Sequence, residues 1–165
     1  MRPEALFTFF RRSRERLGVR FLPADSRETL HEMVKVLRSG GVLVFAVDRL
    51  VTGASVELPF FGEPAKMPIT PAGLALRLGA HVTAAFPYRL TPETAHIHVV
   101  PLTLGEGATT EGQAARATAG TAGERAEGAV EAGTRLQRRF VTELERFLIA
   151  HPDQWISALS PVWEV

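Results

Sequence analysis

The sequence predicts an α/β fold with a mixed central sheet flanked by helices. The first observation is the run Gly41–Val47, in which seven apolar or small residues follow one another without a polar interruption. Such a run is typical of a strand buried on both faces, so we place Val42–Val47 at the centre of the sheet. A short strand candidate, Val19–Leu22, precedes it across a helical pattern, and this order predicts a right-handed parallel unit. A third apolar run, Val82–Tyr88, is expected to supply another strand.

Length and composition are those of one globular domain. The chain has 165 residues, of which 45% are hydrophobic and 22% charged. A net charge of +1 gives no general attraction to nucleic acid, and the absence of cysteine excludes disulfides, thiolate metal sites and cysteine nucleophiles. No apolar run reaches the roughly 18 residues that span a bilayer, and no signal peptide is recognisable. We therefore expect a cytoplasmic protein, soluble or peripheral to a membrane.

The first 17 residues, Met1–Leu17, predict an amphipathic helix that ends at Gly18. Arginines alternate there with leucine and phenylalanine, and Lys35 and Lys66 are the only lysines of the whole chain. Two interpretations stay open. The helix could lie on an anionic membrane surface, or it could be an ordinary domain helix with a solvated arginine face.

The other elements follow from periodicity and from residues that start or stop them. Leu30, Met33, Val34 and Leu37 have helical spacing, and glycines follow them. We further predict a strand Val56–Phe61 ending at Gly62 and a helix within Pro68–Leu78 that either Pro68 or Pro71 opens and Gly79 stops. A strand His96–Leu102 and a helix Thr134–Ala150 stopped by Pro152 follow.

Residues 105–133 have a different composition, rich in alanine, glycine and threonine. Such a segment buries little apolar surface, and each interior glycine costs a helix about 1 kcal/mol relative to alanine. We predict a mobile insertion here, between the sheet and the final helix.

Asp48 and Arg49 are the first charged residues after the predicted central strand. Open α/β sheets bind their ligands at the carboxyl ends of strands. As structural residues, the pair would cap the strand and form a surface ion pair. As functional residues, the carboxylate would orient a basic catalytic group while the arginine holds an anionic substrate. The sequence leaves both interpretations open.

Aromatic residues are the next candidates. Phe60 and Phe61 are adjacent on a predicted strand, so their side chains should point to opposite faces, and one of them should face a groove or a membrane. Trp155 and Trp163 are expected to pack in the core, with interfacial anchoring as the alternative.

Several chemistries have no motif in this chain. A glycine-rich phosphate loop, zinc-ligand spacing and a Gly-x-Ser-x-Gly elbow are all missing. His96 and His98 alternate on one strand face without a neighbouring carboxylate, which we interpret as a solvated edge strand rather than a metal site. We expect no metal and no resident cofactor.

Four segments carry a family resemblance. They are Gly41–Asp48, Leu58–Gly62 with Pro64 and Ala65, Thr70–Ala80, and His151–Trp155. In this order and spacing they resemble the late acyltransferases of lipid A biosynthesis and the related enzymes that acylate phosphatidylinositol mannosides, within the lysophospholipid-acyltransferase-like superfamily.

The resemblance implies a fold like that of glycerol-3-phosphate acyltransferase, and it also implies an acyl transfer activity. A fatty acyl group would move from a thioester of acyl carrier protein or coenzyme A to a hydroxyl of a glycolipid, at the cytoplasmic face of the cell membrane. In this family a histidine five residues before an acidic residue activates the acceptor hydroxyl as a general base.

The resemblance also assigns roles to residues of this chain. Asp48 corresponds to the acidic motif that helps to shape the site. Arg49, Lys66 and Arg89 are candidates for binding phosphates of the acceptor or carrier. Phe60, Phe61 and Gly62 are expected along the acyl groove, and Trp155 is expected to brace its floor.

The chain departs from the family at the catalytic base. None of its five histidines has Asp or Glu five positions later, and Ala84 stands where the family usually has proline. The resemblance therefore implies a single incomplete domain, residues 1–165, whose amino-terminal part is missing and which has little or no activity alone. Two alternatives remain: a non-catalytic lipid- or membrane-binding protein, or one half of a split enzyme completed by a second polypeptide. A domain without its first strands would also expose a sheet edge.

Overall fold

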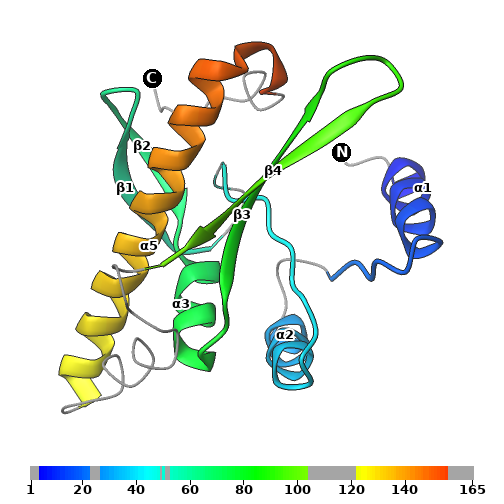
Figure 1. Cartoon of the computed structure of the whole chain (residues 1–165). Coiled ribbons are helices and arrows are strands. Elements are labelled where there is room, and N and C mark those ends of the chain that lie inside the picture. Colours follow the sequence, from blue (N-terminus) through cyan, green and yellow to red (C-terminus); the bar gives the residue numbers. More distant parts are fainter. Residues whose placement is uncertain (1–3, 23–26, 49, 51–52, 104–121, 156–165) are drawn as a thin grey trace.

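The computed structural model describes residues 4–22, 27–48, 50, 53–103 and 122–155. Its helices are α1 (Glu4–Glu15), α2 (Arg27–Arg38), α3 (Thr70–Leu78), α5 (Ala122–Ala150) and the short 3-10 helix η1 (Pro152–Gln154). Its strands are β1 (Ser55–Phe60), β2 (Glu63–Pro68), β3 (Val82–Arg89) and β4 (Ala95–Leu102). The long helix α5 crosses the whole molecule, and both pairs of strands lie against it (Figure 1). No helix in the described ranges is long and apolar enough to cross a bilayer.

The prediction of a central mixed sheet is wrong. The described strands form two separate antiparallel pairs, β1 with β2 and β3 with β4. The run Gly41–Val47 is an irregular segment, as is Val19–Leu22, so the predicted parallel unit is wrong as well. The apolar pattern of 41–47 fits a strand with neighbours on both sides, but no described strand pairs with it. Val42 and Val44 are instead 83% and 90% exposed.

The strand predicted at Val56–Phe61 is confirmed as β1, and it forms a hairpin that the sequence analysis missed. Phe60 pairs with Glu63, so Phe61 and Gly62 alone make the turn. Both have positive φ, 51° and 86°, which is the conformation of a tight type I′ hairpin turn. The second strand escaped notice because it carries two prolines, which central strands avoid.

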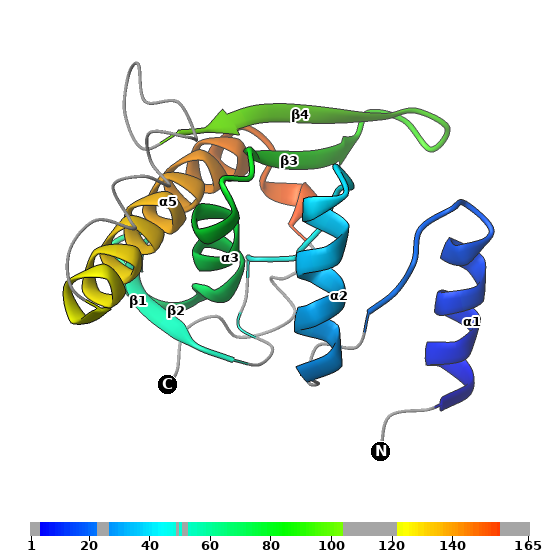
Figure 2. The same cartoon turned by 90° about the horizontal axis from the view of Figure 1, so that it is seen from below.

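The other predicted elements are confirmed within a few residues. Helix α2 lies beside α3, whereas α1 stands apart at the edge of the molecule (Figure 2). Arg20, between α1 and α2 in the chain, donates from Nη2 to Glu32 Oε2 of α2 at 3.0 Å. The helix α3 has a proline in its first turn and ends at Gly79 in the left-handed conformation, as its sequence predicts. β3 and β4 form the predicted strand pair joined by a turn.

The final helix is longer than predicted. It begins at Ala122 instead of Thr134, so residues 122–133 belong to the same continuous helix. Ala132 and Gly133 are buried there, and a Cβ on Gly133 would lie 3.4 Å from Ile69 Cγ1. Gly133 thus allows α5 to pack closely beside α3, which offsets the weak helix propensity of glycine. The rest of the predicted mobile segment, 105–121, lies outside the described residues.

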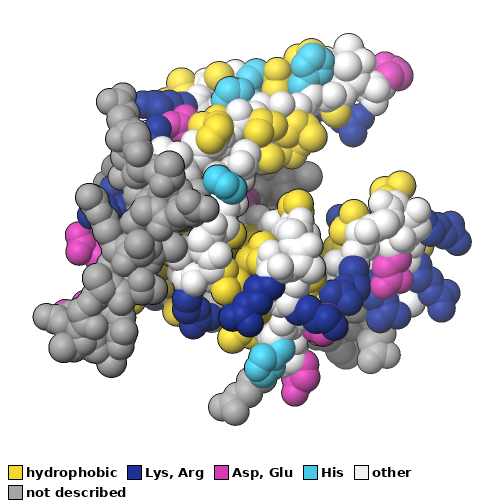
Figure 3. Space-filling view, turned by 60° about the horizontal axis from the view of Figure 1, so that its bottom comes forward, with side chains coloured by type: hydrophobic (Ala, Val, Ile, Leu, Met, Phe, Trp, Pro, Cys, Tyr) yellow, Lys and Arg dark blue, Asp and Glu magenta, His cyan; other side chains and the backbone are white. Residues whose placement is uncertain are grey.

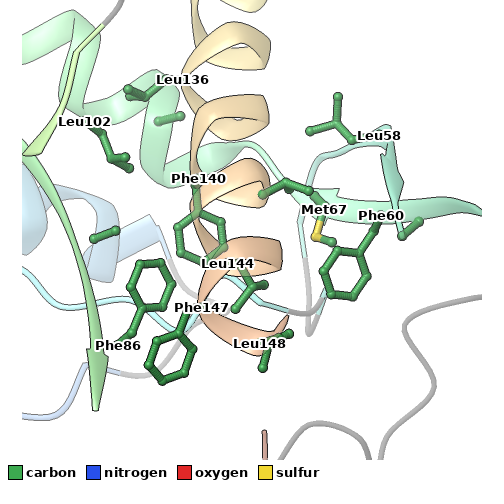
Figure 4. Packing of buried hydrophobic residues seen from close by; sticks show 14 of the residues in the cluster. Leu58, Phe60, Met67, Phe86, Leu102, Leu136, Phe140, Leu144, Phe147 and Leu148 are labelled. Atoms are coloured by element: carbon green, nitrogen blue, oxygen red, sulfur yellow. The ribbon is translucent and has the colours of Figure 1, made fainter. Parts of the chain in front are cut away.

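The core lies on both sides of α5 (Figure 4). On one side Phe86 of β3 stacks on Phe140 and Phe147, with ring centroids 5.9 and 5.1 Å apart. On the other side lie Leu58, Phe60 and Met67 of the β1–β2 hairpin, which are the largest fully buried side chains. Helix α5 therefore joins two hairpins that do not pair with each other.

Candidate functional site

A large cavity lies between the segment 42–48 and strand β3. Its volume is about 600 Å³. Every residue from Val42 to Asp48 and every residue from Val82 to Pro87 lines it, and helices α3 and α5 supply most of the remaining wall. That wall is mainly apolar and includes Leu74, Leu136 and Phe140. The cavity can therefore hold an apolar group of considerable length.

Two of the sequence-predicted site residues, Asp48 and Trp155, line this cavity. Asp48 is half-buried at the end of the irregular segment. The preceding residue is held in place by Gln137, whose Nε2 donates to the carbonyl oxygen of Val47 at 3.3 Å. Gln137 is only 4% exposed, so this bond fixes the segment to the face of α5. The sequence analysis did not identify Gln137.

Phe60 and Phe61 differ in burial, but they do not point to opposite faces of a strand as predicted, because Phe61 lies in the hairpin turn and its ring contacts that of Phe60 with centroids 4.8 Å apart. Phe60 is 0% exposed in the core, whereas Phe61 is 48% exposed in the hairpin turn. Trp155 packs edge-on against Phe60 with ring centroids 5.5 Å apart, and this contact connects the cavity wall to the β1–β2 hairpin. The backbone N–H of Phe61 donates to Glu145 Oε1 of α5 at 2.5 Å, which fixes the turn. Neither phenylalanine lines the cavity itself.

The remaining candidates lie apart from the cavity lining. Gly62 is exposed in the turn, and Lys66 is exposed on β2, where it faces Glu57 across the strand pair. Arg89 donates from Nη1 to the carbonyl oxygen of Pro92 in its own hairpin turn. Its backbone N–H donates to Gln154 Oε1, at 2.8 Å, and Gln154 does line the cavity. Arg49 lies outside the described residues.

The histidines are distributed over four places, one of which is the exposed face of α2 with His31. His81 lines the cavity at the start of β3, and the sequence analysis gave it no role. His96 and His98 are exposed on β4. His151 stacks on Tyr88, with ring centroids 4.4 Å apart. Among the described residues, no three His, Asp or Glu side chains gather in a way that would hold a metal ion.

A second hollow, of about 340 Å³, lies on the outer face of α5. Four arginines surround it, Arg135, Arg138, Arg139 and Arg146, together with Thr142 and Glu143. Arg135 and Arg146 pair with glutamates of the same helix at 3.5 and 2.8 Å. The signal in the sequence was the recurrence of arginine at helical spacing, which the sequence analysis did not follow up.

Comparison with known proteins identifies the family. The family model of the bacterial lipid A biosynthesis acyltransferases matches residues 1–157, which is nearly the whole chain. The chain belongs to this family. The resemblance noted in the sequence is thereby confirmed.

Three curated relatives match part of the chain. Each is a phosphatidylinositol mannoside acyltransferase, two from strains of Mycobacterium tuberculosis and one from Mycolicibacterium smegmatis. The M. tuberculosis proteins are 38% identical over 82 residues, which is 48% of this chain and 26% of the relative. The M. smegmatis protein is 34% identical over 89 residues, or 53% of this chain and 28% of the relative. The matched part therefore spans about a quarter of these relatives.

Proposed function

We propose that this chain is part of an acyltransferase that moves a fatty acyl group from a thioester to a hydroxyl of a glycolipid. The donor is acyl carrier protein or coenzyme A. The observation that supports this most is the apolar cavity with the carboxylate of Asp48 in its wall, in a chain of the lipid A acyltransferase family. Acyl transfer needs such a combination, because an apolar chain must be held beside polar groups that assist the reaction.

The reaction needs a general base that this chain lacks in the family's form. A histidine removes the proton of the acceptor hydroxyl, the oxygen attacks the thioester carbonyl, and the thiol leaves. None of the five histidines here precedes an acidic residue by five positions. Asp48 therefore acts as an electrostatic or structural support, and a segment outside residues 1–165 supplies the base. The chain by itself has little or no activity.

The other candidate residues fall into two groups. Trp155 contributes apolar surface to the wall of the cavity that holds the acyl chain. Buried Phe60 and exposed Gly62 shape the turn that presents Phe61 as apolar surface outside the cavity. Lys66 and Arg49 bind phosphates of the donor or acceptor. Arg89 binds phosphate when its guanidinium gives up the hydrogen bond to the carbonyl oxygen of Pro92. This exchange is favourable because a charged acceptor makes the stronger hydrogen bond.

We further propose that the domain works at the cytoplasmic face of the membrane. Arg11, Arg12, Arg14 and Arg16 of α1 and its extension are exposed, and Phe9 is 65% exposed. Figure 3 shows Lys and Arg side chains gathered over the part of the molecule that contains helices α1 and α2. Exposed basic residues next to apolar ones are what an interfacial helix uses on an anionic lipid surface.

A chimera tests the proposed reaction. Residues 1–157 of this chain replace the corresponding part of the M. smegmatis relative, and transfer from a labelled acyl-coenzyme A to phosphatidylinositol mannoside is measured. We expect transfer by the chimera and a loss of at least tenfold on Asp48→Asn, about 1.4 kcal/mol of transition-state stabilisation. Glu93→Gln, in the exposed β3–β4 turn, is the matched control and should leave the rate unchanged. A folded chimera without transfer would refute the proposal.

A second candidate function is lipid binding without catalysis. The same cavity and the missing base favour it. It predicts that the folded chimera is inactive while the 165-residue chain still binds anionic vesicles.

A further inference from the structure

Helix α5 has two faces with different chemistry. Its inner face contributes apolar residues to the cavity, among them Leu136, Phe140 and Leu144. The hollow of about 340 Å³ lies on its outer face and is lined by residues of α5 alone. Within the described part of the helix, no residue lines both spaces. A ligand in the outer hollow would therefore not depend on the acyl transfer reaction, and the two proposals can fail separately.

The arginines of the outer hollow surround Thr142. Residues three or four positions apart on a helix are neighbours on its surface. Arg138 and Arg139 lie one helical turn before Thr142, and Arg146 lies one turn after it. Thr142 Oγ1 donates to the carbonyl oxygen of Arg138 at 3.1 Å, which keeps this short side chain against the helix. Three guanidinium groups can therefore reach the space above Thr142.

Positive charge in the outer hollow exceeds negative charge. Four arginines and one glutamate line it, so the lining has a net charge of +3. Arg135 and Arg146 each pair with a glutamate of the same helix. In the described ranges no ion pair involves Arg138 or Arg139. Arg135 and Arg139 are like charges four positions apart, which destabilises a helix. An anion in the hollow would remove this repulsion.

We propose that the outer hollow binds a small soluble ligand that carries at least two phosphate groups. A guanidinium donates two parallel N–H bonds to one phosphate, a geometry that lysine does not offer. Arg138 and Arg139 would hold one phosphate on one side of Thr142, and Arg146 would hold the next on the other side. A single phosphate would gain little here, because each exposed ion pair is weak. Two phosphates engage several arginines at once.

The lining distinguishes this ligand from larger anionic partners. Within the described residues, no apolar or aromatic side chain lines the outer hollow. The buried core of a protein interface is enriched in aromatic residues and depleted of charge. Single-stranded nucleic acid stacks its bases on aromatic side chains. A lipid would also need apolar surface for its acyl chains. A small ligand recognised through its phosphates needs none of these contacts.

Calorimetric titration of the 165-residue chain with inorganic diphosphate tests the inference. We expect saturable binding that weakens as salt is raised, and at least tenfold weaker binding of inorganic phosphate, which reaches fewer arginines. Absence of saturable binding at millimolar diphosphate, or equal affinities for the two anions, would overturn the proposal. Tighter binding of a polyglutamate peptide or of phosphatidic acid vesicles through the same arginines would overturn it as well, because the face would then serve an acidic protein or a membrane.

Paired variants check the location. Arg138→Gln with Arg139→Gln should weaken the binding of diphosphate at least tenfold, and Arg138→Lys with Arg139→Lys should weaken it less, because the charge stays while the forked donors are lost. The matched control is Arg38→Gln with Arg77→Gln, which removes the same charge from exposed positions on α2 and α3 and should leave the affinity unchanged. Equal losses for the two glutamine pairs would show a general charge effect and contradict the inference.

A change at Thr142 separates binding from folding. Thr142→Glu places a carboxylate four positions from both Arg138 and Arg146, where ion pairs along the helix support it. We therefore expect thermal unfolding at the same or a higher temperature, together with at least tenfold weaker binding of diphosphate, because the carboxylate occupies the guanidinium groups. A folded Thr142→Glu chain that binds diphosphate as tightly as before would refute the assignment.

Discussion

Gly133 is the residue at which α5 comes close to the start of α3. A Cβ at this position would lie 3.4 Å from Ile69 Cγ1 and 3.6 Å from its Cδ1, so a larger side chain must displace Ile69. Gly128 lies on the same helix, and a Cβ there meets nothing within 4 Å. The two glycines therefore separate the effect of packing from the effect of helix propensity.

We predict that Gly133→Leu lowers the free energy of unfolding by about 1–2 kcal/mol, because overpacking at Ile69 exceeds the gain in helix propensity. Gly128→Leu should raise it by up to about 0.8 kcal/mol, because only the propensity gain remains. Urea unfolding followed by circular dichroism measures both values. If the two substitutions shifted stability in the same direction by the same amount, the close approach of α5 and α3 would be refuted.

Among the elements, those defined by their own residues could be predicted from the sequence. Helix α3 follows from Pro71 at its start and Gly79 at its end, and β3 and β4 follow from their apolar runs. The irregular structure of segment 41–47 could not be predicted from the sequence. The apolar pattern of this segment shows only that it suits a buried place in a sheet, whereas a strand also needs partners with which to pair. The start of α5 was missed for a related reason: packing against α3 favours the small residues that propensity alone penalises.

The helix α1 carries the membrane proposal, and its charges can be tested directly. We predict that Arg11→Gln with Arg12→Gln weakens binding to vesicles containing anionic lipid by roughly 30-fold, since each of the two basic residues near such a surface contributes about 1 kcal/mol. The matched control is Arg138→Gln with Arg139→Gln, which removes the same charge from α5. Vesicle flotation at low and high salt gives the binding constants. Equal losses for both pairs would show a general charge effect instead of a contact through α1.

At the scale of the whole molecule, the two hairpins and helix α3 pack against α5, and α2 packs against α3. An apolar cavity is left between β3 and residues 42–48. Asp48 and Trp155 could be chosen from the sequence because the resemblance pointed to them, and both line the cavity. Gln137 and Gln154 could not be chosen from the sequence, because their roles depend on hydrogen bonds to segments 90 and 65 residues away in the chain. The wall of the cavity is thus assembled from parts that lie far apart in the chain.

The most direct test of the account compares acyl transfer by the purified 165-residue chain with transfer by the chimera in the same assay. A positioned general base contributes about 100-fold or more to such a reaction. We therefore predict transfer by the chimera and a rate at least about 100-fold lower for the chain alone. Equal rates would contradict the account, because they would mean that residues 1–165 already contain the base and the complete site.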